Sequence, residues 1–206
     1  RKKELQELAE ILDWVPANPP RTFHECLQFM WIVEIVGHFM AMCGNGSGVR
    51  IDRVWWPYYE ADMEAGRITR EEALELVECL FLKSQDIGSP LEWPVIFSAT
   101  AGFDVGWAPN ICGADEDGQD VSNDLSCMAM EALSNLHICQ PPICLLYHRD
   151  ISPDVVERAI DLNRMGSGQP AFHHQDLMEK WCFTRGWSPE DAKRVQLGCC
   201  VNPHIR

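Results

Sequence analysis

The sequence is short of positive charge, and this shortage excludes several classes of partner. Its 206 residues contain 17 Lys and Arg against 31 Asp and Glu, which gives a formal net charge of −14 at pH 7. A protein that binds the nucleic-acid backbone gains affinity by displacing counterions with its own cations, and this chain has no surplus of cations. It also has no basic stretch that would bind an anionic membrane surface. We therefore expect no nucleic acid and no membrane among its partners.

The chain also lacks a long apolar segment and an export leader. The longest apolar run, residues 29–42, is interrupted by Glu34 and His38 and is too short to span a bilayer. No charged-then-apolar leader opens the sequence, so we expect a cytoplasmic protein with no membrane span and with reduced thiols. Because the chain starts without Met and stops just after a cysteine-rich turn, we interpret it as a piece of a longer protein.

Metal-site spacings are missing as well, although the chain has ten Cys and seven His. No Cys-x-x-Cys pair and no His-Glu-x-x-His occur, which removes zinc-ribbon, thioredoxin-like and zinc-protease interpretations. In the acidic residues 115–120 the glycine directly follows the second Asp, so turn and helix-cap chemistry explains them better than calcium. The adjacent His173 and His174 point in different directions, which disfavours a shared ion. We expect no metal.

What the sequence does contain is the alternation of strands and helices that is typical of an α/β fold rich in helix. Thr69 and Glu72 form a capping-box signal, and Ser122 is expected to cap a later helix. Residues 86–110 lose periodicity and are expected to be irregular. Helices are predicted over residues 1–15, 22–42, 54 onward, 69 onward, 122–136, 152–165, 174–185 and 188 onward. Strands are predicted over residues 111–113 and 143–147, with a strand-like run over residues 195–197.

The helix predicted from Thr22 to about residue 42 has apolar residues on nearly every face. A helix of this kind must be buried on all sides, which a small domain seldom achieves. We expect His24 and His38 on this helix to be hydrogen-bonded core residues. The pattern again indicates a larger protein.

The pair Cys199-Cys200 follows the strand-like run and precedes Asn202-Pro203, at a strand end or turn where functional residues are common. Residue counting leaves two packed thiols as probable as a reactive pair in a chain with ten cysteines. A reactive pair could be a thiolate nucleophile, a redox pair or a site of radical chemistry.

Several blocks of the sequence resemble, in the same order, the glycyl radical enzymes of the pyruvate formate-lyase-like superfamily. These blocks are residues 21–29, 50–52 with 57–59, 66–73, 113–126, 168–172 and 188–192. The resemblance covers nearly the whole chain. It implies part of a barrel of two parallel half-sheets wrapped by helices, with a cysteine on a loop that enters the barrel. It also implies that residues 1–206 are part of a single pyruvate formate-lyase-like domain that ends at the catalytic cysteine loop, without the C-terminal glycyl radical domain.

The resemblance implies a thiyl-radical enzyme. The cysteine of Cys-Val-x-Pro, which is Cys200, corresponds to the thiyl residue, and Cys199 becomes a candidate second thiol. A glycyl radical outside this chain would take the thiol hydrogen, because the S–H bond and the stabilised glycine C–H bond are similar in strength. The family needs no bound cofactor. An activating enzyme that uses S-adenosylmethionine radical chemistry installs the glycyl radical and is therefore an expected partner, as are small accessory subunits.

One departure from the family narrows the expected chemistry. Many members, including decarboxylases, dehydratases and the choline lyase, have Glu two residues after the cysteine, where this chain has Asn202. An amide cannot act as a general base at neutral pH, which disfavours those activities and leaves Asn202 as a candidate substrate-binding residue.

Fumarate-adding enzymes, such as the benzylsuccinate and alkylsuccinate synthases, need no acid–base residue there. The blocks at residues 54–57, 179–181 and 185–193 look closest to this group. We therefore expect a hydrocarbon and fumarate as substrates. The alternatives are pyruvate formate-lyase chemistry with pyruvate and coenzyme A, in which Cys199 carries the acyl group, and a non-catalytic homologue that acts as a binding module.

Overall fold

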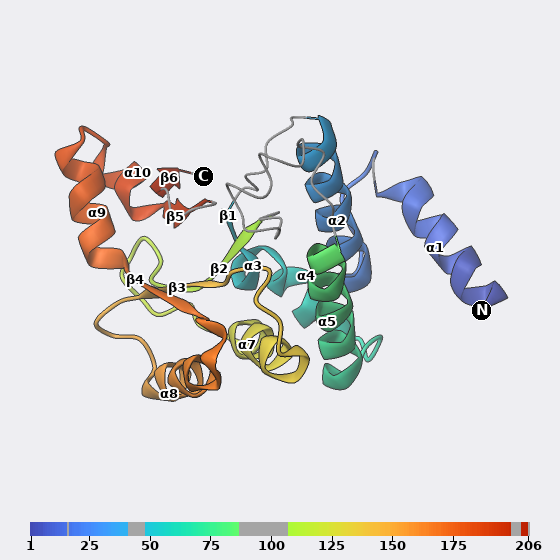
Figure 1. Cartoon of the computed structure of the whole chain (residues 1–206). Helices are drawn as coiled ribbons and strands as arrows, with labels where there is room; N and C mark the ends of the chain where they lie inside the picture. The colour runs from blue at the N-terminus through green and yellow to red at the C-terminus, as the bar shows by residue number, and fades with distance from the viewer. Residues whose placement is uncertain (16, 41–47, 87–106, 199–202, 206) are drawn as a thin grey trace, which may run out of the picture.

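The computed structural model describes residues 1–15, 17–40, 48–86, 107–198 and 203–205 (Figure 1). The earlier elements are α1 (Lys2–Trp14), α2 (Phe23–Met40), β1 (Gly48–Arg50), α3 (Ile51–Val54), α4 (Trp56–Glu64) and α5 (Arg70–Asp86). The later elements are β2 (Ala108–Cys112), α7 (Asp124–Leu136), β3 (Cys144–Tyr147), α8 (Pro153–Leu162), a π-helical turn (Asn163–Ser167), β4 (Ala171–His174), α9 (Gln175–Thr184), α10 (Pro189–Lys193), β5 (Val195–Leu197) and β6 (Pro203–Ile205).

Strands β1 to β4 form one parallel sheet in chain order. Parallel neighbours need a crossover, and α7 and α8 supply it between β2 and β3 and between β3 and β4. Figure 1 shows α7 and α8 on one side of the sheet, with α9, α10 and the antiparallel β5–β6 pair on the other side. The predicted α/β class, with parallel strands wrapped by helices, is confirmed.

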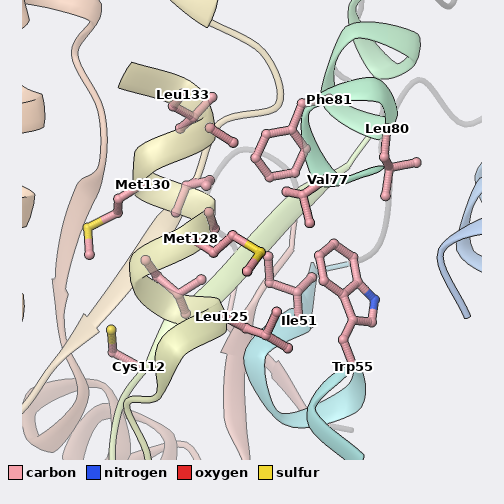
Figure 2. Packing of buried hydrophobic residues seen from close by; sticks show 14 of the residues in the cluster. Ile51, Trp55, Val77, Leu80, Phe81, Cys112, Leu125, Met128, Met130 and Leu133 are labelled. Atoms are coloured by element: carbon pink, nitrogen blue, oxygen red, sulfur yellow. The ribbon is translucent and has the colours of Figure 1, made fainter. Parts of the chain in front are cut away.

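The main hydrophobic core lies between the sheet and the helices α3, α5 and α7. Figure 2 shows Val77 and Phe81 of α5 facing α7, with Trp55 from the end of α3 beside them. Ile111 of β2 and Leu145 of β3 are fully buried in the same cluster. Each large apolar side chain buried in this way contributes about 1.5–3 kcal/mol to folding. The core therefore fixes one face of the sheet and leaves the other for the β5–β6 pair.

Three of the predicted helix starts, at Thr22, Thr69 and Ser188, have the side-chain hydrogen bonds of a helix cap. At α5, the Thr69 amide donates to Glu72 Oε2 at 2.8 Å and the Glu72 amide donates to Thr69 Oγ1 at 3.2 Å, which completes the capping box. At α2, the Glu25 amide donates to Thr22 Oγ1 at 3.2 Å. At α10, the Asp191 amide donates to Ser188 Oγ at 3.0 Å. The prediction for Ser122 was wrong by one residue, because Asn123 caps α7 and forms a capping box with Ser126.

Strand β2 begins at Ala108, three residues before the strand predicted at residues 111–113. The irregular segment predicted over residues 86–110 therefore ends too late, and its residues 87–106 lie outside the described residues. All five residues of β2 are buried. A parallel strand that is covered on both faces has no alternating pattern, and Pro109 and Asn110 read as loop residues in the sequence.

Helix α2 is not buried on every face of the described structure. Val33 and Val36 are 41% and 46% exposed, and His24 is also exposed, so the prediction of a core histidine there was wrong. The side chain of His38 lies outside the described residues. No helix in the described part of the chain combines the length and the apolar character needed to cross a membrane.

Candidate functional site

The three site residues predicted from the sequence, Cys199, Cys200 and Asn202, lie outside the described residues. The structure does describe both ends of the segment that carries them. Strands β5 and β6 pair antiparallel, with Leu197 opposite Pro203. What holds this strand pair against the parallel sheet therefore decides where the base of the cysteine segment lies.

Asn110 in the middle of β2 holds β5 through its side-chain amide. Its Nδ2 donates to the Leu197 carbonyl at 2.8 Å and to the Ala108 carbonyl at 2.9 Å, and its Oδ1 accepts from the Leu197 amide at 2.8 Å. Asn110 is completely buried, so a lost hydrogen bond could not be replaced by water. The Asn110 side chain thus forms hydrogen bonds with both the backbone N–H and the backbone C=O of Leu197, three residues before Cys200.

Gly48 of β1 lets β5 approach the sheet edge. A Cβ atom at this position would lie 1.5 Å from the Leu197 carbonyl oxygen and 2.4 Å from its carbon. Leu197 itself packs against Ala108, Cys144 and Leu146 on the face of the sheet opposite the main core. Three features therefore hold Leu197, at the base of the cysteine segment: the close approach of its backbone to Gly48, its two hydrogen bonds with the Asn110 side chain, and a small apolar cluster.

Burial raises the pKa of six of the seven described cysteines. Burial raises the pKa of Cys144 to about 11 and that of Cys26 to about 12. Burial also raises the pKa of Cys112, Cys79, Cys127 and Cys182. Thiols of this kind are poor nucleophiles, because the thiolate is the reactive form. Four of the described cysteines are buried, Cys127 is half-buried, and Cys79 and Cys139 are exposed.

Arg50 and Asp52, two residues apart at the end of β1, hold the end of β2. Asp52 accepts the backbone N–H of Cys112 and the Ser126 hydroxyl, the latter at 2.6 Å, and Arg50 donates to the Cys112 carbonyl. Cys112 has φ of 63°, a left-handed conformation that is unfavourable for a residue with a Cβ atom. The two charged side chains stabilise this turn through both backbone groups of Cys112. Burial raises the pKa of Asp52, and the nearby Arg50 opposes this rise.

Gln175 and Gly113 continue this network on the far side of the same turn. Gln175 Oε1 accepts from the Ala114 amide at 2.8 Å, and its Nε2 donates to the Ala114 carbonyl at 3.2 Å. A Cβ atom at Gly113 would lie 2.5 Å from Arg50 Nη2 and 2.6 Å from Gln175 Oε1. Glycine is therefore required at this position by both its φ of 92° and the space available.

The acidic residues 115–120 form a turn, as predicted. Asp115 Oδ1 accepts from the amides of Asp117 and Gln119 at 2.9 and 2.8 Å. Asp120 accepts from the Ser122 hydroxyl at 2.6 Å and lies 3.3 Å from the ring nitrogen of the buried His148. Burial raises the pKa of Asp120, but these hydrogen bonds outweigh it and lower the pKa overall.

The adjacent histidines of β4 lie on opposite faces of the sheet. His173 pairs with Leu146, on the face of the β5–β6 pair, and His174 pairs with Tyr147, on the other face. Burial lowers the pKa of His173. The two rings therefore point in different directions, as the sequence predicts for adjacent residues. Within the described ranges no group of three or more His, Cys, Asp and Glu residues is placed to hold a metal.

A family model described as pyruvate formate lyase-like matches residues 1–206, the whole chain. This chain belongs to the pyruvate formate lyase-like family of glycyl radical enzymes. It is 32% identical over 208 residues to an indoleacetate decarboxylase of Tractidigestivibacter scatoligenes, covering 98% of this chain and 23% of that protein. It is 33% identical over 211 residues to an isethionate sulfite-lyase of Nitratidesulfovibrio vulgaris, covering 100% of this chain and 25% of that protein.

The fold is also that of solved members of the family. The structure of a hydroxyproline dehydratase from Clostridioides difficile, with trans-4-hydroxy-L-proline bound, superposes with a TM-score of 0.86 at 28% identity. The match covers 99% of this chain and 26% of that one. The predicted glycyl radical enzyme barrel is thereby confirmed as the fold class. The chain spans about a quarter of the length of these relatives.

In the sequence, Arg50 and Asp52 stand out only as part of a block that resembles the family. Gly48, Asn110 and Gln175 were not predicted. A buried asparagine within an otherwise apolar strand is an available signal, because such an amide needs partners. Nothing local in the sequence identifies Leu197, 87 residues away, as that partner. These residues hold the end of β2 and the strand β5 that precedes Cys199 and Cys200 in the sequence.

Proposed function

We propose that this chain is the part of a glycyl radical enzyme catalytic subunit that carries the thiyl cysteine, Cys200. The observation that carries the proposal is the family match over the whole chain, together with the β5–β6 pair anchored on the face of the parallel sheet opposite the main core. We further propose that residues 1–206 are one part of a pyruvate formate-lyase-like domain and that the glycyl radical domain lies outside them. An activating enzyme that uses S-adenosylmethionine, and small accessory subunits, are the proposed partners in the cytoplasm.

The proposed chemistry assigns separate tasks to the residues of this chain. The glycyl radical supplies abstraction of the hydrogen atom from the cysteine thiol. Asn110 and Gly48 hold Leu197 on the face of the sheet opposite the main core. They thereby hold the base of the segment that carries Cys200. Asn202 would contact the substrate through its amide, without moving a proton. A reaction that proceeds by hydrogen-atom transfer requires a site from which water and oxygen are excluded. A loop inside a barrel provides such a site.

For the substrates, we propose a hydrocarbon and fumarate, joined to give a substituted succinate. The support is Asn202, which stands where family members that move protons have a carboxylate, and the resemblance of residues 54–57, 179–181 and 185–193 to the benzylsuccinate and alkylsuccinate synthases. Trp55 does not support this assignment, because it is only 1% exposed and packs in the main core.

A second candidate is an elimination or decarboxylation of a small polar substrate. It is favoured by the relatives, whose names are those of a decarboxylase, a dehydratase and a sulfite-lyase. Acyl transfer from pyruvate to coenzyme A, with Cys199 as the acyl carrier, is the remaining enzymatic alternative, and a non-catalytic binding module is the alternative outside catalysis.

The deciding experiment uses the complete polypeptide that contains this chain, activated under anaerobic conditions. Electron paramagnetic resonance measures the glycyl radical, and mass spectrometry identifies the products. Three sets of substrates are compared: toluene or an alkane with fumarate; indoleacetate, hydroxyproline or isethionate; and pyruvate with coenzyme A. We expect a substituted succinate. Formate from pyruvate and coenzyme A would overturn the assignment to fumarate addition. Elimination products, formed when no substituted succinate is formed, would overturn it as well.

Two cysteine variants test the thiyl assignment itself. Cys200→Ala should abolish product, by at least about 1,000-fold, while the glycyl radical signal still forms, because activation does not need the thiol. Cys199→Ala is the matched control and should keep most of the activity in a fumarate-adding enzyme. Loss of turnover in Cys199→Ala with full activity in Cys200→Ala would show that the radical cysteine was wrongly assigned.

A further inference from the structure

A cavity of about 520 Å³ lies beside β5, between the end of β1, α3, α4 and the end of α10. Three of its lining residues are arginines from three separate elements: Arg50, Arg53 and Arg194. The one carboxylate among the described lining residues is Glu116. The walls thus carry three positive charges and one negative charge in a protein whose formal net charge is −14.

The pairing of these arginines within the protein is partial: Arg194 also pairs with Glu190 at 2.8 Å, and the buried Asp52 lies near Arg50. Glu116 is shared between Arg53 and Arg194, with both nitrogen-to-oxygen distances at 3.7 Å, and its side chain is 45% exposed. Exposed ion pairs of this length contribute little to stability. Arg50 donates its terminal nitrogens to the carbonyls of Cys112 and Ala114, which carry no net charge. Arginine side chains are suited to the planar, bidentate recognition of an oxyanion.

Two buried polar groups of the cavity also lack a partner among the described residues. Arg50 is 5% exposed and its Nε donates to no acceptor, and Gln196 is 3% exposed and its Oε1 accepts from no donor. A half-turn of the Gln196 amide presents its NH₂ group in place of the oxygen, so this side chain can donate to an anion as well. Buried polar groups without partners are rare in native proteins and indicate a site for an additional group.

We infer that this cavity, lined by Arg50, Arg53, Arg194 and Gln196, is a binding site for a small oxyanion, a carboxylate or a phosphate. Gln196 precedes Cys200 by four residues, so their Cα atoms lie at most about 14 Å apart. The site therefore borders the strand that leads to the cysteine. The inference does not depend on the proposed reaction, because binding can be measured without a radical.

The test is isothermal titration of the complete polypeptide, without activation, with fumarate and separately with inorganic phosphate at low ionic strength. Arg53→Gln and Arg194→Gln should each weaken binding roughly tenfold, because each removes a charge-assisted hydrogen bond. Glu116→Gln should tighten binding, because it removes the carboxylate that competes for both arginines. Tighter binding of fumarate would identify a carboxylate site, and tighter binding of phosphate a phosphate site.

The matched control is Arg164→Gln, which removes the same charge from a surface arginine that is 78% exposed and pairs with Asp161. This variant should bind as the unchanged protein does. Arg53 and Arg194 are 38% and 45% exposed, so their variants should fold, and thermal melting checks this. Absence of binding by both anions, an equal loss in Arg164→Gln, or weaker binding in Glu116→Gln would overturn the inference.

Discussion

At the scale of single residues, the site depends on polar side chains that bind the backbone rather than other side chains. Asn110 binds both polar groups of Leu197, Asp52 and Arg50 bind both polar groups of Cys112, and Gln175 binds both of Ala114. Each of these side chains is at least 95% buried. A backbone held on both its donor and its acceptor side cannot rotate without losing two hydrogen bonds in a region that excludes water.

Replacing Asn110 therefore tests whether the cysteine segment needs this anchor. Asn110→Ala leaves the Leu197 amide and carbonyl buried and unpaired, and should destabilise the protein by about 2–4 kcal/mol in urea unfolding. Amide hydrogen exchange at Leu197 should accelerate, and turnover should fall while the glycyl radical signal remains. Asn135→Ala, whose amide donates to Glu78 at an exposed position, is the control and should cost less than about 1 kcal/mol. Unchanged exchange at Leu197 in Asn110→Ala would contradict the anchoring role.

At the scale of helices and strands, features with local causes could be predicted from the sequence and features with distant causes could not. The capping box of Thr69 and Glu72 spans three residues, so the start of α5 was predicted correctly. Strand β2 is paired on both sides and covered on both faces, and its hydrogen-bond partners lie in β1 and β3. Nothing within residues 108–110 shows this, so the strand start was missed. The cysteine pair stands out in the sequence because its setting resembles a family and it stays a prediction, whereas nothing local identifies Gly48 and Asn110 as the residues that hold Leu197.

The local cause of α5 can be tested by removing its cap. Thr69→Ala leaves the Glu72 amide without its side-chain acceptor at the first turn of the helix, and should lower the free energy of unfolding by about 1 kcal/mol. The comparison variant is Thr184→Ala, which removes a hydroxyl at the end of α9 that donates to the Trp181 carbonyl at 2.7 Å. Because that carbonyl is exposed and water can replace the donor, the second variant should cost only a few tenths of a kcal/mol. Equal losses in the two variants would mean that the cap contributes nothing specific.

At the scale of the whole molecule, the fold places two kinds of surface on opposite faces of one parallel sheet. The face toward α7 is apolar and carries the main core, while the opposite face receives the β5–β6 pair and, beside it, the arginine-lined cavity. Strand β1 and α3, which contribute Arg50 and Arg53 to this cavity, come from the first third of the chain and lie beside β2 (Figure 1). Residues on the face of the β5–β6 pair can therefore change while the core on the other face stays unchanged.

Global stability should depend on pH through Glu34, a carboxyl group on α2 that is 6% exposed. Burial raises its pKa to about 8, from an ordinary value of 4.5, because it disfavours the charged form. The folded protein then holds one more proton than the unfolded chain between these two values, so this group's contribution to stability is full below about pH 4.5 and is lost as the pH rises toward 8. In the complete polypeptide, Glu34→Gln should therefore raise the urea midpoint at pH 8 more than at pH 5. Glu60→Gln, which removes an exposed carboxylate from α4, should shift the midpoint equally at both pH values. Parallel pH profiles for Glu34→Gln and the unchanged protein would show that Glu34 is ionised in the folded state.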